Sequence, residues 1–179
     1  VTGRRPNGYH DVKMIMQQIS LCDTIAVGWE PDPGSEGIGI RLEVSRPDLP
    51  ADASNLAWKA AEAMIAGFGG PAGGVLSIDI QKRIPMAAGL AGGSSNCAAV
   101  LHGINQLWGL GLSVKELCEI GAKLGSDVPF CIMGQAAAEE SLQETFKDDP
   151  DACHCALATG TGTDLEPLTG LRSYVVLSK

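Results

Sequence analysis

The sequence predicts a two-layer domain built from both α-helices and β-strands. Strand-like patterns of alternating apolar and β-branched side chains occur at residues 24–29, 38–44 and 75–82. Apolar side chains at helical spacing occur at residues 55–66 and 96–107. With 179 residues, of which 45% are hydrophobic and 19% charged, the chain can bury one sizeable core. Because strands and helices alternate along the chain, the α/β and α+β classes both remain open.

The chain begins with turn-forming residues and continues with strands. Residues 1–10 contain a Pro-Asn-Gly sequence, so we expect a loop there. Three strands should follow, at residues 13–20, 24–29 and 38–44, and a turn-rich segment separates the last two.

The first predicted helix covers residues 55–66, with Ser54 or Asn55 as its cap. Its apolar face should comprise Leu56, Ala60, Ala63 and Met64. The glycine-rich residues 67–74 end this helix, and the strand at residues 75–82 follows.

The second half of the chain is predicted to be mainly helical. A helix over residues 113–124 should begin with a capping box, because Glu116 follows Ser113 by three residues. Residues 135–147 are rich in alanine and glutamate and predict a further helix with a solvent-exposed charged face. Two late strands are expected at residues 156–159 and 174–178.

Charge and composition exclude several classes of partner. The formal net charge is -8 and the 13 basic residues are not clustered, which argues against nucleic-acid binding. We find no apolar run long enough to span a membrane and no leader peptide, so we expect no membrane partner and a cytoplasmic location. The six cysteines are scattered and should be reduced thiols. Cys153, His154 and Cys155 form too small a set for a structural zinc site, so no metal-ligating residues are assigned directly.

The run PMAAGLAGGSSN, residues 85–96, connects a predicted strand to a predicted helix. Backbone N–H groups at a helix start have no intrahelical partner, and the helix dipole is positive there, so a phosphate placed at this point is stabilised. The alternative interpretation is a tight turn with Ser94 or Ser95 as the helix cap. The run matches neither a Walker A loop nor a GxGxxG motif, so these residues alone leave both interpretations open.

Other polar residues have both a chemical and a structural interpretation. Asp127 follows a glycine and precedes an apolar segment, where a carboxylate could lie close to a ligand. It could equally be a helix cap with Pro129 in the first turn. Tyr9 and His10 lie on the expected loop and are either a binding pair or surface residues, whereas His102 is interpreted as a residue on a helix face.

A family resemblance rests on three separated segments: PNGYHDVKMIMQQISLCDTI, PMAAGLAGGSSNCAAVLHGINQLWGLGLS and LGSDVPFCIMG. Together they resemble the 4-diphosphocytidyl-2-C-methyl-D-erythritol kinases, a family of the GHMP kinase superfamily. The PxxxGLxGGSS pattern is typical of GHMP kinases in general, whereas RRPNGYH followed by MQQISLCD resembles this family in particular. The resemblance covers residues 3–134 and resumes weakly at ALATGTG.

The resemblance implies an α+β fold, the GHMP kinase N-terminal domain of the ribosomal protein S5 domain 2-like type. It also implies ATP-dependent phosphorylation of the 2-hydroxyl of 4-diphosphocytidyl-2-C-methyl-D-erythritol, a small cytidylated polyol, in non-mevalonate isoprenoid synthesis. Asp127 would orient or deprotonate the attacking hydroxyl, and Tyr9 and His10 would bind the cytosine. The ATP phosphates would be bound, with Mg²⁺ near Ser94 or Ser95, by Pro85, Met86, Ala87, Ala88, Gly89, Leu90, Ala91, Gly92, Gly93, Ser94 and Ser95.

The chain also departs from the family pattern. The family's first strand, which carries a lysine and an asparagine of the active site, and its C-terminal domain have no counterpart here. Residues 1–179 are therefore expected to be an incomplete N-terminal ATP-binding domain, in which residues 135–155 look like an insertion. The alternatives are another GHMP kinase, of the homoserine or mevalonate type, and a catalytically inactive nucleotide-binding fragment.

Overall fold

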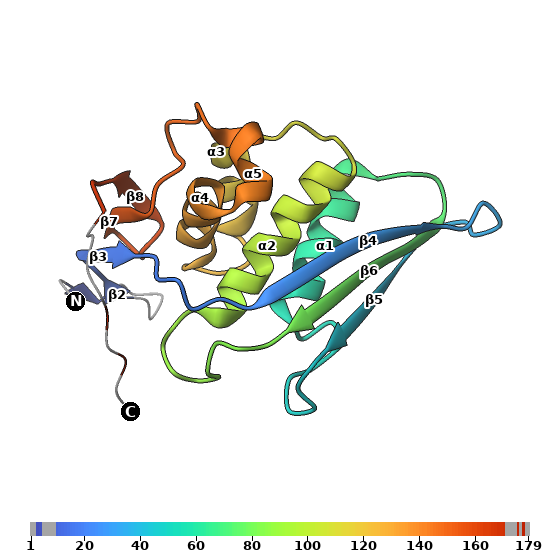
Figure 1. Cartoon of the computed structure of the whole chain (residues 1–179), viewed down its shortest axis with the longest axis horizontal. Coiled ribbons are helices and arrows are strands. Elements are labelled where there is room, and N and C mark those ends of the chain that lie inside the picture. Colours follow the sequence, from blue (N-terminus) through green and yellow to red (C-terminus); the bar gives the residue numbers. More distant parts are fainter. Residues whose placement is uncertain (1–2, 5–9, 171–174, 176, 178–179) are drawn as a thin grey trace.

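The main sheet of the domain has three strands and is covered by helices on one face. The computed structural model describes residues 3–4, 10–170, 175 and 177. Strands β4 (Thr24–Pro31), β6 (Gly74–Gln81) and β5 (Ile38–Val44) lie side by side in that order. β6 is antiparallel to β4 and parallel to β5, since helix α1 (Leu56–Phe68) forms the crossover between β5 and β6. Figure 1 shows the helices on one side of this sheet, which confirms a two-layer α+β fold.

Two helices pack directly on the sheet. Alternate side chains of β6 are buried, including Leu76, Ile78 and Ile80, as the period of two predicts. Helix α1 and helix α2 (Gly92–Leu107) cover them. Gly103 lets α2 approach β4 closely, because an added Cβ there would stand 2.8 Å from Val27 Cγ2.

The start of α1 follows the sequence prediction. Asn55 is the N-cap, and its side chain accepts a hydrogen bond from the Ala57 N–H at 3.0 Å. Ala60 and Met64 are fully buried as expected, whereas Ala63 is only partly buried.

Three shorter helices form a second group beside α2. They are α3 (Val114–Gly121), α4 (Val128–Ala138) and α5 (Glu140–Phe146). The predicted capping box is present at α3, where Ser113 accepts from the Glu116 N–H and Glu116 accepts from the Ser113 N–H. The single helix predicted over residues 135–147 is wrong, because the backbone of Glu139 is extended and divides it into the end of α4 and all of α5.

Helix α5 is partly buried, although its charged composition predicts a solvent-exposed segment. Leu142 is 4% and Phe146 is 3% exposed, while the charged side chains of the helix face solvent. The Phe146 ring packs edge-on against His102, with 5.3 Å between ring centroids. One face of α5 therefore belongs to the core of the domain.

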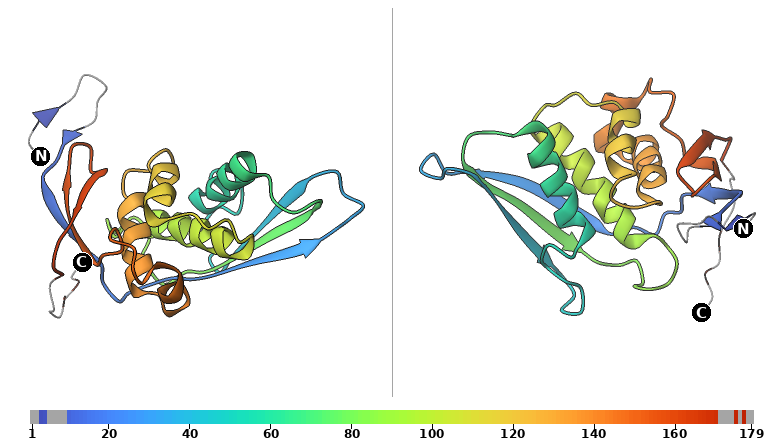
Figure 2. Two further views of the ribbon diagram at one scale, coloured as in Figure 1. Left: turned by 90° about the horizontal axis from the view of Figure 1, so that it is seen from above. Right: turned by 180° about the vertical axis from the view of Figure 1, so that it is seen from behind.

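A second small sheet lies beyond the α4 end of the helices (Figure 2). It contains β3 (Met14–Gln17), β7 (Cys155–Thr159) and β8 (Asp164–Pro167), all antiparallel. β3 is shorter than the predicted strand at residues 13–20, and β8 is not predicted at all. A two-residue pair joins β1 (Gly3–Arg4) to β2 (His10–Asp11). The strand predicted at residues 174–178 falls largely outside the described residues.

Among the described residues, no helix combines the length and the apolarity that crossing a bilayer requires.

Candidate active site

The glycine-serine run divides into an exposed loop, residues 85–91, and the first turn of helix α2. The helix begins at Gly92, four residues earlier than predicted. The first backbone hydrogen bond of helix α2 runs from the Ser95 N–H to the Ala91 carbonyl at 2.8 Å. The N–H groups of Gly92, Gly93 and Ser94 precede that bond and therefore face out from the helix start.

The cap interpretation of Ser94 and Ser95 is wrong. Ala91 occupies the cap position, with a left-handed backbone and no capping side-chain bond. Both serines lie inside the helix, at its third and fourth residues. The helix start is consequently free of the side-chain cap that would compete with an anion.

The loop before α2 contains strained backbone. Ala87 and Ala91 have φ angles of 54° and 52°, a region that costs a non-glycine residue about 1–2 kcal/mol. Gly89 also has a positive φ, of 70°, which glycine adopts freely. Such strain persists only where surrounding contacts fix the chain.

Asp23, at the entrance to β4, supplies contacts of that kind. Its Oδ1 accepts the N–H groups of Arg83 at 2.6 Å and Ile84 at 2.8 Å, just before the loop. Its Oδ2 forms an ion pair with the Lys82 ammonium. Since Asp23 Oδ2 and the Gly92 carbonyl are both acceptors, the Asn96 amide nitrogen faces them, donating at 2.7 Å and 3.1 Å.

This carboxylate is charged although it is buried. The Asp23 side chain is 1% exposed and that of Lys82 is 5% exposed. Burial by itself would raise the pKa of Asp23, but the Lys82 ammonium and the two backbone N–H groups outweigh burial and hold the pKa below its ordinary value of 3.8.

Asp127 lies at the start of helix α4, as one of its two interpretations predicts. Pro129 follows in the first turn, but the Asp127 carboxylate makes no capping bond to the helix backbone. Within the described part of the chain, its Oδ1 accepts one long hydrogen bond, at 3.4 Å, from the Ser126 hydroxyl. The half-buried carboxylate thus keeps acceptor capacity for another group.

The starts of α2 and α4 lie next to each other. An added Cβ on Gly125 would stand 3.9 Å from Ser94 Oγ, which places the turn before α4 against the first turn of α2. Gln135 of α4 donates from Nε2 to the Ser95 carbonyl at 2.9 Å and to Ser95 Oγ at 3.2 Å. The fold therefore brings the predicted phosphate loop and the predicted catalytic carboxylate together.

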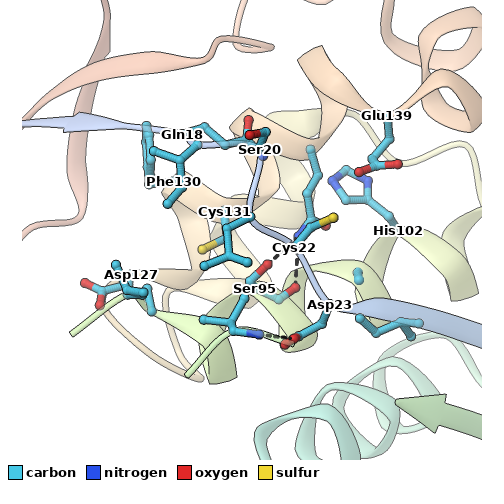
Figure 3. A pocket seen from close by; sticks show the side chains of 18 of the residues that line it. Gln18, Ser20, Cys22, Asp23, Ser95, His102, Asp127, Phe130, Cys131 and Glu139 are labelled. Carbon is cyan, nitrogen blue, oxygen red and sulfur yellow. Dashed lines mark hydrogen bonds between the residues drawn. The ribbon is translucent and has the colours of Figure 1, made fainter. Parts of the chain in front are cut away.

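Asp127 and part of the predicted phosphate loop, namely residues 89–91 and Ser95, line one open cavity of about 1450 Å³. Figure 3 shows Ser95 on its wall, with Asp127 to one side and Asp23 to the other. Cys131 also lines it, but burial raises the pKa of this thiol to about 12, so it is neutral and a poor nucleophile. A helix start with exposed N–H groups, next to a carboxylate that makes no capping bond, is suited to binding an anion.

Two candidate residues cannot be placed in this cavity. Tyr9 lies outside the described residues, and of His10 only the backbone is described, in β2. His102, interpreted as a helix-face residue, lines the cavity but is only 2% exposed. Its Nε2 faces the Ile132 carbonyl at 3.0 Å, and its Nδ1 has no hydrogen-bond partner among the described residues.

Sequence reasoning missed the group formed by Asp23, Lys82 and Asn96. These residues are 59 and 14 positions apart along the chain, so no local spacing links them. The available signal was weak: Asp23 directly precedes strand β4, and Lys82 directly follows strand β6.

Comparison with protein families and with curated relatives points in one direction. The profile of the GHMP kinases N terminal domain matches residues 55–135. A 4-diphosphocytidyl-2-C-methyl-D-erythritol kinase of Synechococcus sp. (strain JA-2-3B'a(2-13)) is 44% identical over 177 residues, 99% of this chain and 48% of the relative. The enzyme of the same name from Geobacter metallireducens is 47% identical over 146 residues, 82% of this chain and 50% of the relative. The chain spans about half the length of the curated relatives it matches.

Solved structures show the same fold. A crystal structure of 4-(cytidine 5'-diphospho)-2C-methyl-D-erythritol kinase matches with a TM-score of 0.63 and 33% identity, covering 92% of this chain and 48% of that one. Homoserine kinase from Cytophaga hutchinsonii matches with a TM-score of 0.55 at 20% identity, covering 82% of this chain and 42% of that one. The latter likeness concerns the fold alone.

Proposed function

We propose that this chain, which matches the N-terminal domain of GHMP kinases in sequence and fold, carries the phosphate-binding part of an ATP-dependent small-molecule kinase. The proposed reaction is transfer of the ATP γ-phosphoryl group to the 2-hydroxyl of 4-diphosphocytidyl-2-C-methyl-D-erythritol. The 44–47% identity to curated enzymes of that name supports this substrate.

One structural observation carries the proposal: the turn that leads into Asp127 packs against the uncapped start of α2, where Gly125 lies next to Ser94, and the Asp127 carboxylate makes no capping bond to its own helix. Phosphoryl transfer requires chiefly that donor and acceptor are positioned and that phosphate charge is stabilised. Backbone N–H groups at a helix start provide the second, and a carboxylate beside them can orient an attacking hydroxyl.

In this proposal, the N–H groups of Gly92, Gly93 and Ser94 bind the ATP phosphates, and residues 85–91 enclose them. Asp127 accepts the proton of the substrate hydroxyl while its oxygen attacks the γ-phosphorus. The bond between the γ-phosphorus and the ADP oxygen breaks, and ADP leaves with the electron pair. The positive end of the α2 dipole stabilises the charge on the transferred group.

Mg²⁺ fits this site as the companion of ATP. The hydroxyls of Ser94 and Ser95 are hard oxygen donors at the helix start, and Ser95 Oγ is already oriented by Gln135 at 3.2 Å. When bound, the ion would neutralise phosphate charge, and these two serines are the residues we assign to it.

Tyr9 and His10 are our proposed cytosine-binding residues, on the strength of the family resemblance. We expect Tyr9→Ala and His10→Ala to raise KM for the cytidylated polyol more than they lower kcat, because both residues would bind the base in ground and transition state alike. Steady-state kinetics with varied polyol measures this. A fall in kcat at unchanged KM would argue against a cytosine site.

Two alternatives remain worth testing beside this substrate. Homoserine kinase shares the fold, as does the mevalonate kinase of Methanococcus jannaschii, with a TM-score of 0.57 and 16% identity. An ATP-binding but inactive fragment is the other alternative, since the chain matches half of its relatives' length.

We propose the cytoplasm as the location, in keeping with six free thiols in the described part of the chain.

The decisive experiment measures ADP release by the protein that carries this chain, with the cytidylated polyol, homoserine and mevalonate offered separately. Our proposal predicts turnover with the cytidylated polyol only. Turnover with one of the other two alcohols would overturn the substrate assignment, and ATP binding without any turnover would favour the inactive alternative.

A further inference from the structure

We infer that Asp23 is a positioning residue that fixes both ends of the phosphate loop through one buried carboxylate. The inference rests on the proposed function insofar as the loop is taken to bind ATP phosphates. Asp23 itself belongs to neither the loop nor the helix, since it lies at the entrance to β4.

The carboxylate fixes the upstream end of the loop with two backbone bonds. Asp23 Oδ1 accepts from the N–H groups of Arg83 and Ile84, the last two residues before Pro85. Because these donors belong to the main chain, substitution of the Arg83 or Ile84 side chain does not remove them. The direction in which the chain enters the loop is thereby set.

The same carboxylate fixes the downstream end through Oδ2. Asn96, in the second turn of α2, donates to Asp23 Oδ2 at 2.7 Å and to the Gly92 carbonyl at 3.1 Å. The Lys82 ammonium pairs with Oδ2 as well and lies so close to Gly92 that an added Cβ there would stand 2.7 Å from Nζ. The first and last residues around the loop thus meet at one charged group.

This arrangement explains why strained backbone is retained in the loop. Ala87 and Ala91 adopt left-handed backbone that alanine disfavours. A loop fixed at both ends by charged, buried hydrogen bonds keeps that conformation before any nucleotide is bound. ATP then binds a preformed loop and does not have to order it.

Lys82 has a defined part in this arrangement. Its side chain is 5% exposed and its ammonium pairs with Asp23, so we assign it to neutralising the buried carboxylate and not to binding phosphate. Asp23, Lys82 and Asn96 act together on the loop, whereas the α2 N–H groups contact the phosphate.

The test compares Asp23→Asn and Asn96→Ala with a matched control in the protein that carries this chain. Asp48→Asn is the control, because Asp48 likewise forms an ion pair with a basic side chain, that of Arg46 at 2.7 Å, but this pair lies on the exposed surface. The two measurements are hydrogen exchange of the loop amides without nucleotide, and ATP kinetics with calorimetric ATP binding.

Both variants lose the hydrogen bond between Asp23 Oδ2 and Asn96, and Asp23→Asn also loses the ion pair with Lys82, so the loop amides should exchange about tenfold faster or more because the loop opens locally. KM and Kd for ATP should rise by about tenfold or more, while kcat at saturating ATP changes by less than about threefold, since bound ATP restores the loop. The control should change none of these values. If a variant merely failed to fold, the concentration of active enzyme and hence the apparent kcat would fall, while KM for ATP would stay unchanged.

Folded variants with parental loop exchange and parental ATP affinity would overturn the inference. If Asp23→Asn does not fold, Asn96→Ala decides, because it removes only the two hydrogen bonds of the Asn96 amide and places a good helix former in α2. If the parent binds ATP but phosphorylates none of the offered alcohols, the proposed function fails while ATP affinity still decides on Asp23. A parent that binds no ATP overturns both.

Discussion

At the scale of single residues, His102 is a buried imidazole whose protonation would destabilise the fold. Burial lowers its pKa to about 4, and the bond to the Ile132 carbonyl offsets this only partly. Since that carbonyl can only accept, His102 Nε2 carries the proton and the ring is neutral at pH 7. Its folded pKa lies below the unfolded value of 6.5, so stability is complete above pH 6.5 and is lost as pH falls toward 4.

We therefore expect the free energy of unfolding to fall by about 3 kcal/mol through His102 between pH 6.5 and pH 4. Urea unfolding across this range measures it. His102→Gln should flatten the dependence of the free energy of unfolding on pH. An unaltered slope in His102→Gln would show that other groups cause it.

Glycine substitutions at two alanines of the loop should change the stability of the fold in opposite directions. Ala91→Gly should stabilise the fold by up to about 1 kcal/mol, because relief of left-handed strain exceeds the entropic cost of glycine. Ala88 has no left-handed backbone, so Ala88→Gly should destabilise by about 0.5–1 kcal/mol. Thermal unfolding of both variants checks the contrast, and equal effects would contradict the loop geometry.

At the scale of elements, the Asp23 contacts join the entrance of β4 to the β6–α2 connection. Loss of one partner of a buried ion pair typically costs about 3–5 kcal/mol, so we expect Asp23→Ala to destabilise the fold by that order at pH 7. The pKa of Asp23 is lowered in the fold, so its contribution is present above the ordinary value near 3.8 and disappears as pH falls below it.

Urea unfolding at pH 7 and near pH 3 tests this dependence. The difference between the parent and Asp23→Ala should narrow at the lower pH, where protonation removes the ion pair. Asp48→Asn, which disrupts an exposed pair, should behave like the parent at both values. A difference that stays constant with pH would mean that Asp23 contributes through packing and not through charge.

The elements also show where sequence patterns are informative. Strand β5 occupies the predicted residues, and the capping box and Asn55 identify the starts of α3 and α1, because these signals are local. The break at Glu139 was missed because Leu142 and Phe146 turn α5 back to the core, which is a tertiary effect. β8 has weak strand character by itself and forms by pairing with β7.

At the scale of the whole molecule, the candidate site arises where separate parts of the chain meet. The glycine-serine run and Asp127 each had two interpretations from the residues alone, and the family resemblance singled out the chemical one, which stays a prediction. Their proximity depends on α4 packing against α2, and the contacts of Asp23 join residues far apart in the chain. No single segment encodes that geometry.

Asp127→Asn in the protein that carries this chain is the most direct test of a kinase site at the junction of α2 and α4. Loss of a positioned general base should lower kcat with the cytidylated polyol by about 10²- to 10⁴-fold, while Kd for ATP stays within about threefold. Asp148→Asn, at an exposed surface position, is the control and should retain parental turnover. Near-parental turnover in Asp127→Asn would contradict a catalytic role for this carboxylate.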